Sequence, residues 1–498
     1  MSVRKNGYLP LVKINKQIRY MLLPKKEFNR LVVLVGDKNY YQLFSWFVKI
    51  LRKTRLPYLK YNGFWMSVMQ INMIKALFKF QSELKKLKIE AVNTEAEKKI
   101  KENKLLIYRE WIRILQTIAD GIAWRNLKFN RPVIRLCSEN KSPGYLSEED
   151  LVGFLKYLSM MTGFVIANDL TRCLRISDLT QILPNGKTFL YEIKKSGDKL
   201  YDVNYILGHM RKQKKLDDPQ KIRQLVVQLA IADNNITVPV YKNGVIREEL
   251  KAEILDLDFP IQTHLSTIKK IIRKADKKGY AQTELEPGYF VEMSAYDKIA
   301  KREIDSDKYI QYKEIQFEKY APEWLKNKKS KTVSISNYES FFQEGGHYPR
   351  NFLPYSVFPF SAKNCVRLMM GCLHLRIYLN LDIFEKKIKK AGWIVKKEER
   401  NLRFFKEQEK LHKKEYQEKG GMYKYKVDET FYRVSRSDKN GTYETSILTT
   451  QILIMLTSFY KTDFLIEEIN HLYLEAKRTK SKKRIITINC LGEKRVLI

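Results

Sequence analysis

The sequence is poor in cysteine and has no long apolar run. Its 5 cysteines are odd in number and scattered, and no two follow the Cys-x-x-Cys spacing. This excludes a cysteine-based structural zinc site and favours a reduced compartment, so we expect a cytoplasmic protein. No stretch reaches the roughly 18–20 apolar residues of a membrane span. No long apolar region follows Met1, so we expect neither a membrane partner nor a secretory signal.

The sequence also lacks the glycine-rich signatures of nucleotide-handling enzymes. It has no P-loop, no Gly-x-Gly-x-x-Gly at a helix start and no Gly-x-Ser-x-Gly, so no nucleotide-hydrolysing motor is recognisable. Acidic residues are few beside basic ones, 56 against 93, which gives a net charge of +37. Such a field attracts nucleic acid or an anionic membrane surface. Codon bias also enriches lysine, so the charge supports a polyanion partner without proving one.

The most informative stretch is a pair of apolar, β-prone runs around a Pro-Asn-Gly turn signal at residues 184–186. The first run carries a lone aspartate, Asp178, and the second carries a Glu-x-Lys pattern made by Glu192 and Lys194. This arrangement predicts a β-hairpin. Two carboxylates and an ammonium on adjacent strands are the groups that a divalent cation and a phosphodiester require.

The length of the loop decides which side chains of the hairpin face each other. A three-residue loop at 184–186 sets Asp178 opposite Glu192. Opposed side chains share a face, with Cβ atoms about 5 Å apart, and Lys194 shares that face as well. A two-residue loop would set Asp178 opposite Ile193 instead. The sequence leaves both registers open, and the candidate site depends on the first.

These residues resemble the PD-(D/E)xK nuclease superfamily. The core of that family is a helix, a three-strand meander carrying D and (D/E)xK, then a helix and a further strand. Residues 147–158 predict a helix capped by Ser147, with an acidic first turn. Residues 163–167 predict the first strand, and residues 221–231 predict the later helix. The resemblance thus implies an αβββαβ, restriction-endonuclease-like α/β core flanked by mostly α-helical N- and C-terminal domains.

The resemblance also implies an activity, that of a metal-dependent phosphodiesterase, more often an endonuclease than an exonuclease. Asp178 and Glu192 would hold one or two Mg²⁺ (or Mn²⁺) ions, which polarise the phosphate and lower the pKa of an attacking water. Lys194 would orient that water or stabilise the negative charge that develops on the phosphate oxygens.

Further implications of the resemblance are weaker. Glu148 or Glu149 would supply an extra carboxylate, as in some members of the superfamily, and Gln224 would contact the water or the substrate. DNA is the expected partner because most such nucleases cut DNA. Restriction, anti-phage defence, repair and mobile-element processing are all open as settings, and the architecture of the chain leads us to expect bacterial restriction or anti-phage defence. A second copy of the chain or a defence-complex protein would be a further partner, and such a complex could keep the nuclease silent until triggered.

A structural role for the same residues has to be weighed against catalysis. Glu-x-Lys is common in a chain so rich in both residues, and Glu97 and Glu385 begin the same pattern in charged helical runs. Glu192 differs because its run is apolar and because the turn brings an aspartate opposite. In the alternative, the hairpin is a structural ion pair within a non-catalytic nucleic-acid-binding protein.

A compact basic run follows the hairpin and consists of Arg211, Lys212, Lys214 and Lys215. Beside an active site, this run would neutralise backbone phosphates and contribute to nucleic-acid binding. Elsewhere it would be a solvated loop. Both interpretations stay open at this point.

Four regions are expected along the chain. They are a mostly helical N-terminal region (1–117), the nuclease core with a lead-in helix (118–240), a mixed connector (241–340) and a mostly helical basic C-terminal domain (341–498). Within the first, residues 83–104 predict a solvated helix or the arm of a helical hairpin. Within the last, Ser361 predicts the N-cap of a helix that runs to about Tyr378.

Overall fold

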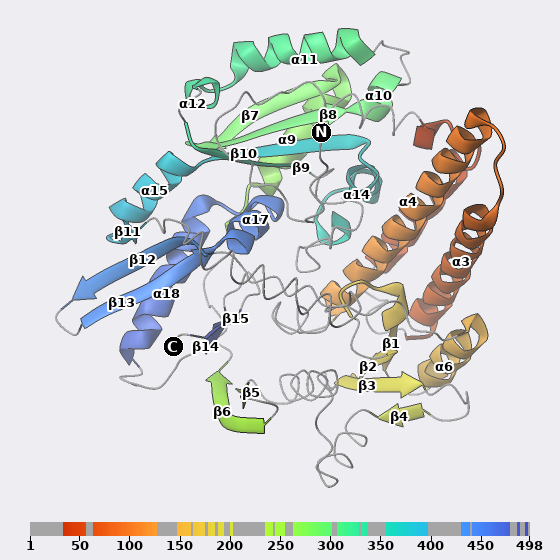
Figure 1. Ribbon diagram of the computed structural model, residues 1–498, viewed down its shortest axis with the longest axis horizontal. Coiled ribbons are helices and arrows are strands. Elements are labelled where there is room, and N and C mark those ends of the chain that lie inside the picture. Colours follow the sequence, from red (N-terminus) through yellow and green to blue (C-terminus); the bar gives the residue numbers. More distant parts are fainter. Residues whose placement is uncertain are drawn as a thin grey trace.

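The fold is known from a computed structural model (Figure 1). It describes residues 33–55, 63–126, 147–160, 163–174, 178–184, 188–193, 200–202, 235–242, 245–253, 262–300, 306–327, 330–336, 355–396, 430–438, 441–478, 486–488 and 494–496. Among these residues, no helix combines the length and the apolar composition that a membrane crossing requires.

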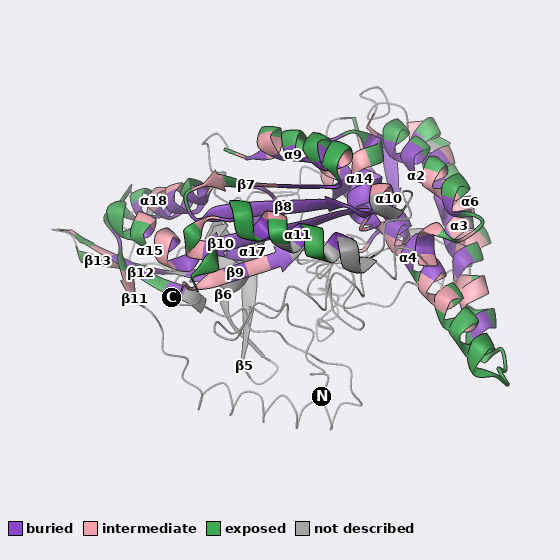
Figure 2. Ribbon diagram, turned by 90° about the horizontal axis from the view of Figure 1, so that it is seen from above, coloured by how far each residue is buried: buried purple, intermediate pink, exposed green. Residues whose placement is uncertain are grey.

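The N-terminal part contains three helices, α2 (Tyr40–Thr54), α3 (Gly63–Ile89) and α4 (Glu95–Asn126). Helices α3 and α4 pack together along their length and form an arm with an exposed tip, which confirms the helical hairpin expected there (Figure 2). At the start of α4, the Thr94 hydroxyl accepts from the Glu97 N–H, and the Glu97 carboxylate accepts from the Thr94 N–H. This capping box satisfies two N–H groups that the helix itself leaves unbonded.

A small antiparallel sheet follows, in the order β1-β2-β3-β4. Its elements are α6 (Glu148–Met160), β1 (Phe164–Ala167), the 3-10 turn η2 (Asn168–Leu170), β2 (Leu179–Ile182), β3 (Thr188–Ile193) and β4 (Leu200–Asp202). The Ser147 hydroxyl accepts from the Asp150 N–H, so the expected helix, its cap and the first strand are confirmed. Helices α3 and α6 both pack against β1.

A fourth strand extends the meander, since β4 pairs with β3. The helix expected at residues 221–231 lies outside the described residues. The next strands, β5 (Asn235–Lys242) and β6 (Val245–Glu253), pair with each other as a separate two-stranded sheet.

A second antiparallel sheet has the order β7-β8-β10-β9, and its apolar residues belong to the largest cluster of buried side chains, which also includes the cores of the helical arm and of the small sheet. Its strands are β7 (Tyr280–Glu286), β8 (Tyr289–Ala295), β9 (Thr332–Ser336) and β10 (Leu373–Asn380). Residues alternate between its two faces, as in any pleated strand. One face is apolar and belongs to the same cluster as the buried side of helix α9 (Leu265–Lys278). The other face lies under α11 (Ser306–Tyr320; Figure 1), and we call it the polar face because Glu292 and Arg376 lie on it, although it also carries the buried Phe290 and Tyr378.

The polar face holds a buried ionic cluster centred on Glu292. Its carboxylate lies 3.2 Å from the Lys313 ammonium and accepts from the Tyr280 hydroxyl at 2.9 Å. Burial alone would raise the pKa of Glu292, but Lys313 and Arg376 outweigh that effect and lower it. Helix α11 is thus held on the sheet both by this ionic cluster and by the packing of Phe317 against Phe290 and Tyr378.

The remaining elements lie between the strands of the second sheet or follow that sheet in the chain. They are α10 (Tyr296–Ala300), α12 (Glu323–Lys326), the turn η3 (Tyr355–Val357), α14 (Ala362–Met369), α15 (Leu381–Lys390), β11 (Ile394–Lys396), β12 (Thr430–Asp438), β13 (Gly441–Leu448), α17 (Thr449–Thr457), α18 (Thr462–Arg478), β14 (Ile486–Ile488) and β15 (Lys494–Val496). Strands β11, β12 and β13 form a third antiparallel sheet.

The helix expected from Ser361 to about Tyr378 is shorter than predicted. Ser361 does cap it, since its hydroxyl accepts from the Asn364 N–H, but the helix ends at Met369. Gly371 then adopts a positive φ of 75°, a common way for a helix to stop. The following residues form β10, in which apolar side chains alternate with polar ones. This strand pairs with β8 on one side and with β9 on the other.

Two of the expected region boundaries do not separate structural units. The boundary between residues 117 and 118 falls inside α4. The boundary between residues 340 and 341 divides strands of one sheet, because β10 pairs with β8 and β9. The part after residue 340 was expected to be mostly helical, yet it contributes β10, β11, β12 and β13 to sheets. Long-range strand pairing, rather than local composition, joins these segments.

Candidate functional site

The two central strands of the small sheet show the register on which the candidate site depends. Leu179 pairs with Tyr191, and Ile182 pairs with Thr188. This is the register that the three-residue loop predicts, and the described ladder ends at the Leu179–Tyr191 pair, one residue short of Asp178 and Glu192. The register of the two-residue loop is therefore excluded.

Asp178 lies just before β2 and is half-buried. Its backbone N–H donates to the Tyr191 carbonyl at 2.9 Å, and its carbonyl accepts from the Asn168 N–H at 2.9 Å. Its carboxylate oxygen Oδ2 accepts from the Ile193 N–H at 2.6 Å. The carboxylate is thus turned toward the end of β3, where the Glu-x-Lys pattern lies.

The other predicted site residues are placed only in part. Glu192 is next to last in β3 and pairs with Tyr201 of β4, while its side chain lies outside the described residues. Glu148 and Glu149 stand in the first turn of α6, half-buried and exposed respectively. The predicted residues whose positions fall outside the described part of the chain are Lys194, Gln224, Arg211, Lys212, Lys214 and Lys215.

The described residues contain no group of three or more His, Cys, Asp or Glu side chains arranged to hold a metal ion. That search does not include the side chain of Glu192. The donor set proposed for Mg²⁺ fits the chemistry of that ion, since two carboxylates from opposed strand positions supply oxygen ligands. Of the two proposed ligands, Asp178 has a described carboxylate, and this carboxylate accepts a hydrogen bond from the Ile193 N–H.

Two buried polar residues of the helical arm hold the hairpin in place. Gln70 of α3 donates to the Val165 carbonyl at 2.6 Å and accepts from the Ala167 N–H at 2.9 Å. It thereby satisfies backbone groups along the free edge of β1, which would otherwise be buried without partners. Sequence reasoning did not assign Gln70 this role; the only available signal was a polar residue inside an apolar helical stretch.

Asp120 of α4 likewise satisfies backbone groups, in the segment between β1 and β2. Its carboxylate accepts from the backbone N–H groups of Arg172 and Cys173 at 2.6 and 3.0 Å. It also pairs with the Arg172 guanidinium at 3.0 Å, and both side chains are largely buried. Asp120 therefore anchors the chain to α4 at residues 172 and 173, five to six residues before Asp178.

Comparisons with known protein families, with curated proteins and with solved structures find no match to this chain. The resemblance to the PD-(D/E)xK superfamily therefore rests on the motif residues, their register and the order of the helix and strands around them.

Proposed function

We propose that the chain is a metal-dependent nuclease that hydrolyses phosphodiester bonds of nucleic acid, with DNA as the favoured substrate. Asp178, Glu192 and Lys194 would form its catalytic centre. The observation that supports the proposal is the strand register within a helix-and-meander unit, which is that of the three-residue loop up to the Leu179–Tyr191 pair and would set Asp178 opposite Glu192 one residue further on. Bacterial restriction or anti-phage defence is the setting we propose for such an activity.

The chemistry divides among the three residues. Asp178 and Glu192 would hold the ion, and bound Mg²⁺ or Mn²⁺ supplies polarisation of the phosphate and an acidified water. The bond from the Ile193 N–H fixes the carboxylate of Asp178 in one orientation, which lowers the entropy cost of binding a cation. Lys194, the residue after β3, would stabilise charge on the phosphate oxygens.

The test is cleavage of supercoiled plasmid DNA with Mg²⁺ and with EDTA. Asp178→Asn is the sharpest variant because an amide oxygen still accepts from the Ile193 N–H but is a poor ligand for Mg²⁺. Glu192→Gln removes the second carboxylate, and Glu102→Gln on the exposed arm is the matched control. We expect both site variants to lose cleavage by at least about a hundredfold, with the control unchanged. Wild-type cleavage by Asp178→Asn would refute the catalytic assignment.

A second function is favoured by one specific observation. The carboxylate of Asp178 already bonds the Ile193 N–H at 2.6 Å, which is also what a purely structural residue at a hairpin end would do. In this alternative, the chain binds nucleic acid without cutting it. Wild-type protein would then bind DNA but cleave none with either Mg²⁺ or Mn²⁺, and Asp178→Ala would lower thermal stability while leaving DNA affinity unchanged.

A further inference from the structure

Helix α9 has one apolar side and one strongly basic side. Its apolar residues, Ile268, Ile271, Ile272 and Ala275, are buried. Its outer side carries six exposed cations, Lys269, Lys270, Arg273, Lys274, Lys277 and Lys278. The helix has a single acid, Asp276, and that carboxylate is bound to the buried Arg367 guanidinium at 2.7 Å. The positive charge of the outer side is therefore not neutralised within the helix.

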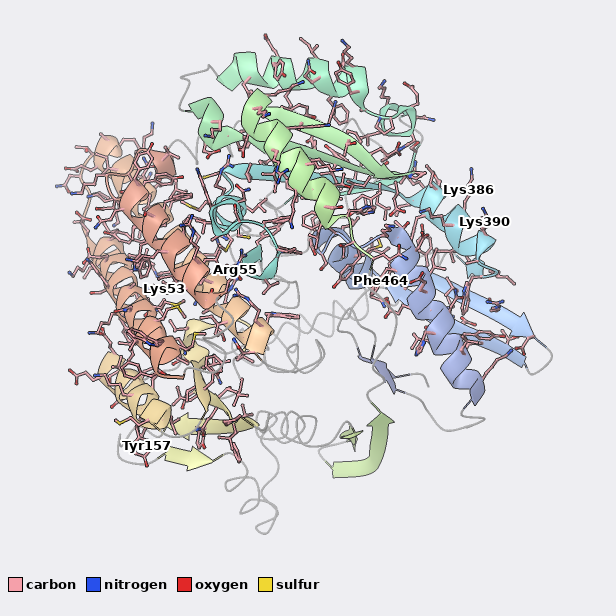
Figure 3. All side chains as sticks on the ribbon, turned by 180° about the vertical axis from the view of Figure 1, so that it is seen from behind. Lys53, Arg55, Tyr157, Lys386, Lys390 and Phe464 are labelled. Atoms are coloured by element: carbon pink, nitrogen blue, oxygen red, sulfur yellow. The ribbon has the colours of Figure 1, made fainter. Side chains whose placement is uncertain are left out.

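Two neighbouring helices extend this positive surface. Helix α14 lies between α9 and α2, and the end of α2 is marked by Lys53 and Arg55 (Figures 2 and 3). Helix α2 contains no acidic residue, and its Lys49, Arg52 and Lys53 are exposed. Arg55 donates to the carbonyls of Ser356, Phe358 and Phe360, which joins the end of α2 to the segment that leads into α14. We call the exposed cations of α9 and of the last turns of α2, with Lys363 of α14, the basic surface.

A pocket of about 390 Å³ opens in this surface between α9 and α14. Its polar lining comes from Lys269 and Arg273 on α9 and from Ser361 and Asn364 at the start of α14. The two cations are four residues apart and therefore stand on the same side of the helix, one turn from each other. Two cations, a hydroxyl and an amide are suited to the oxygens of a phosphate group.

The arm is also rich in lysine, but it mixes acidic residues with its cations, and two of these cations form ion pairs. There Lys86 pairs with Glu83 at 2.9 Å and Lys98 with Glu95 at 3.5 Å, each within one helical turn. Across the described part of the chain, none of the six cations on the outer side of α9 forms such an ion pair. The high net charge of the chain alone does not explain this difference, since both regions share it.

We propose that the basic surface binds the sugar–phosphate backbone of duplex DNA, with one phosphate seated in the pocket lined by Lys269 and Arg273. Two observations favour a duplex over the alternatives. Helices α9 and α14 contain no aromatic residue on which the bases of a single strand could stack, Phe360 at the pocket is buried, and the exposed Tyr41 of α2 stands at the opposite end of that helix from Arg52 and Lys53. The apolar residues of α9 and α14 are buried in the core, so they present no apolar anchor to a lipid bilayer.

The surface lies outside the catalytic hairpin, so this proposal does not depend on cleavage. Binding of a duplex oligonucleotide is measured in EDTA at several salt concentrations, with the full chain. The pocket variant is Lys269→Gln with Arg273→Gln. The control is Lys85→Gln with Lys99→Gln on the arm, which removes the same charge from exposed positions. Because all four side chains are exposed, each variant should fold, and circular dichroism and thermal unfolding verify this.

We expect the pocket variant to bind duplex DNA roughly tenfold more weakly at about 0.1 M salt, with a salt slope reduced by about two. The control should match the wild type, and single-stranded DNA should bind more weakly than duplex. Equal losses in both variants would mean that only net charge matters and would overturn the proposal, as would unchanged binding by the pocket variant.

Vesicles containing phosphatidylserine test the membrane alternative. If the pocket variant lost vesicle binding and kept its DNA affinity, the surface would belong to a membrane and the proposal would be wrong. The Asp178→Asn protein should bind DNA like the wild type in this assay. A failed catalytic assignment would therefore be recognised by cleavage alone, and a failed binding surface by affinity alone.

Discussion

Glu286 at the end of β7 connects three parts of the molecule. Its carboxylate accepts from the His264 ring at 3.2 Å, from the Lys387 ammonium at 2.7 Å and from the Thr462 N–H at 2.8 Å. These partners belong to the N-cap of α9, to α15 and to the first residue of α18. Neutralising Glu286 should therefore weaken the junction between the second sheet and the C-terminal helices.

The size of the effect follows from the pKa of Glu286. Burial alone would raise this pKa, but the hydrogen bonds from His264, Lys387 and Thr462 outweigh burial and lower it from 4.5 to about 2. A group whose pKa is lower in the folded state stabilises the protein above its unfolded pKa. That stabilisation is lost as the pH falls from about 4.5 toward 2. The shift corresponds to about 3 kcal/mol at neutral pH, as an order of magnitude.

Glu286→Gln should accordingly unfold at lower guanidinium concentration than the wild type at pH 7, by about 2–3 kcal/mol. The gap should narrow to less than half by pH 3 and close only below about pH 2, because the carboxyl is protonated first in the unfolded chain and last in the fold. Glu323→Gln, whose side chain is 89% exposed, is the control and should be neutral at both pH values. A stability gap of the same size at pH 7 and pH 3 would refute the linkage, and so would equal stability at pH 7.

Two further predictions concern the support of the hairpin. Asp120→Ala should lower stability by about 3–5 kcal/mol, because it leaves the largely buried Arg172 guanidinium without this carboxylate. Hydrogen exchange should show the loss first in the small sheet, and uniform loss across the chain would contradict this. Gly163→Ala should destabilise by more than about 1 kcal/mol, because Gly163 has a φ of +113° and an added Cβ would lie 2.5 Å from the Ile182 carbonyl oxygen. Gly153→Ala on the exposed side of α6 meets no atom within 4 Å and should stabilise slightly, and thermal unfolding compares the two.

The sequence determined the features that depend on neighbours a few residues away. The Pro-Asn-Gly turn and its flanking β-prone runs led to the strand register that pairs Leu179 with Tyr191. Ser147 and Ser361 marked helix starts correctly, because a cap bonds an N–H only three residues ahead. These interactions are local, so their signals lie within short windows of sequence.

Tertiary structure decided the features that depend on distant parts of the chain. Residues 373–380 became a strand because β8 and β9, from other parts of the chain, offered pairing on both sides. Asp120 and Gln70 gained their roles only when the arm met the small sheet. The basic surface likewise exists because folding sets α9 beside α14, whose starts are almost a hundred residues apart. Local sequence specifies turns and caps through short-range bonds, but which elements meet depends on burial and pairing summed over the whole fold.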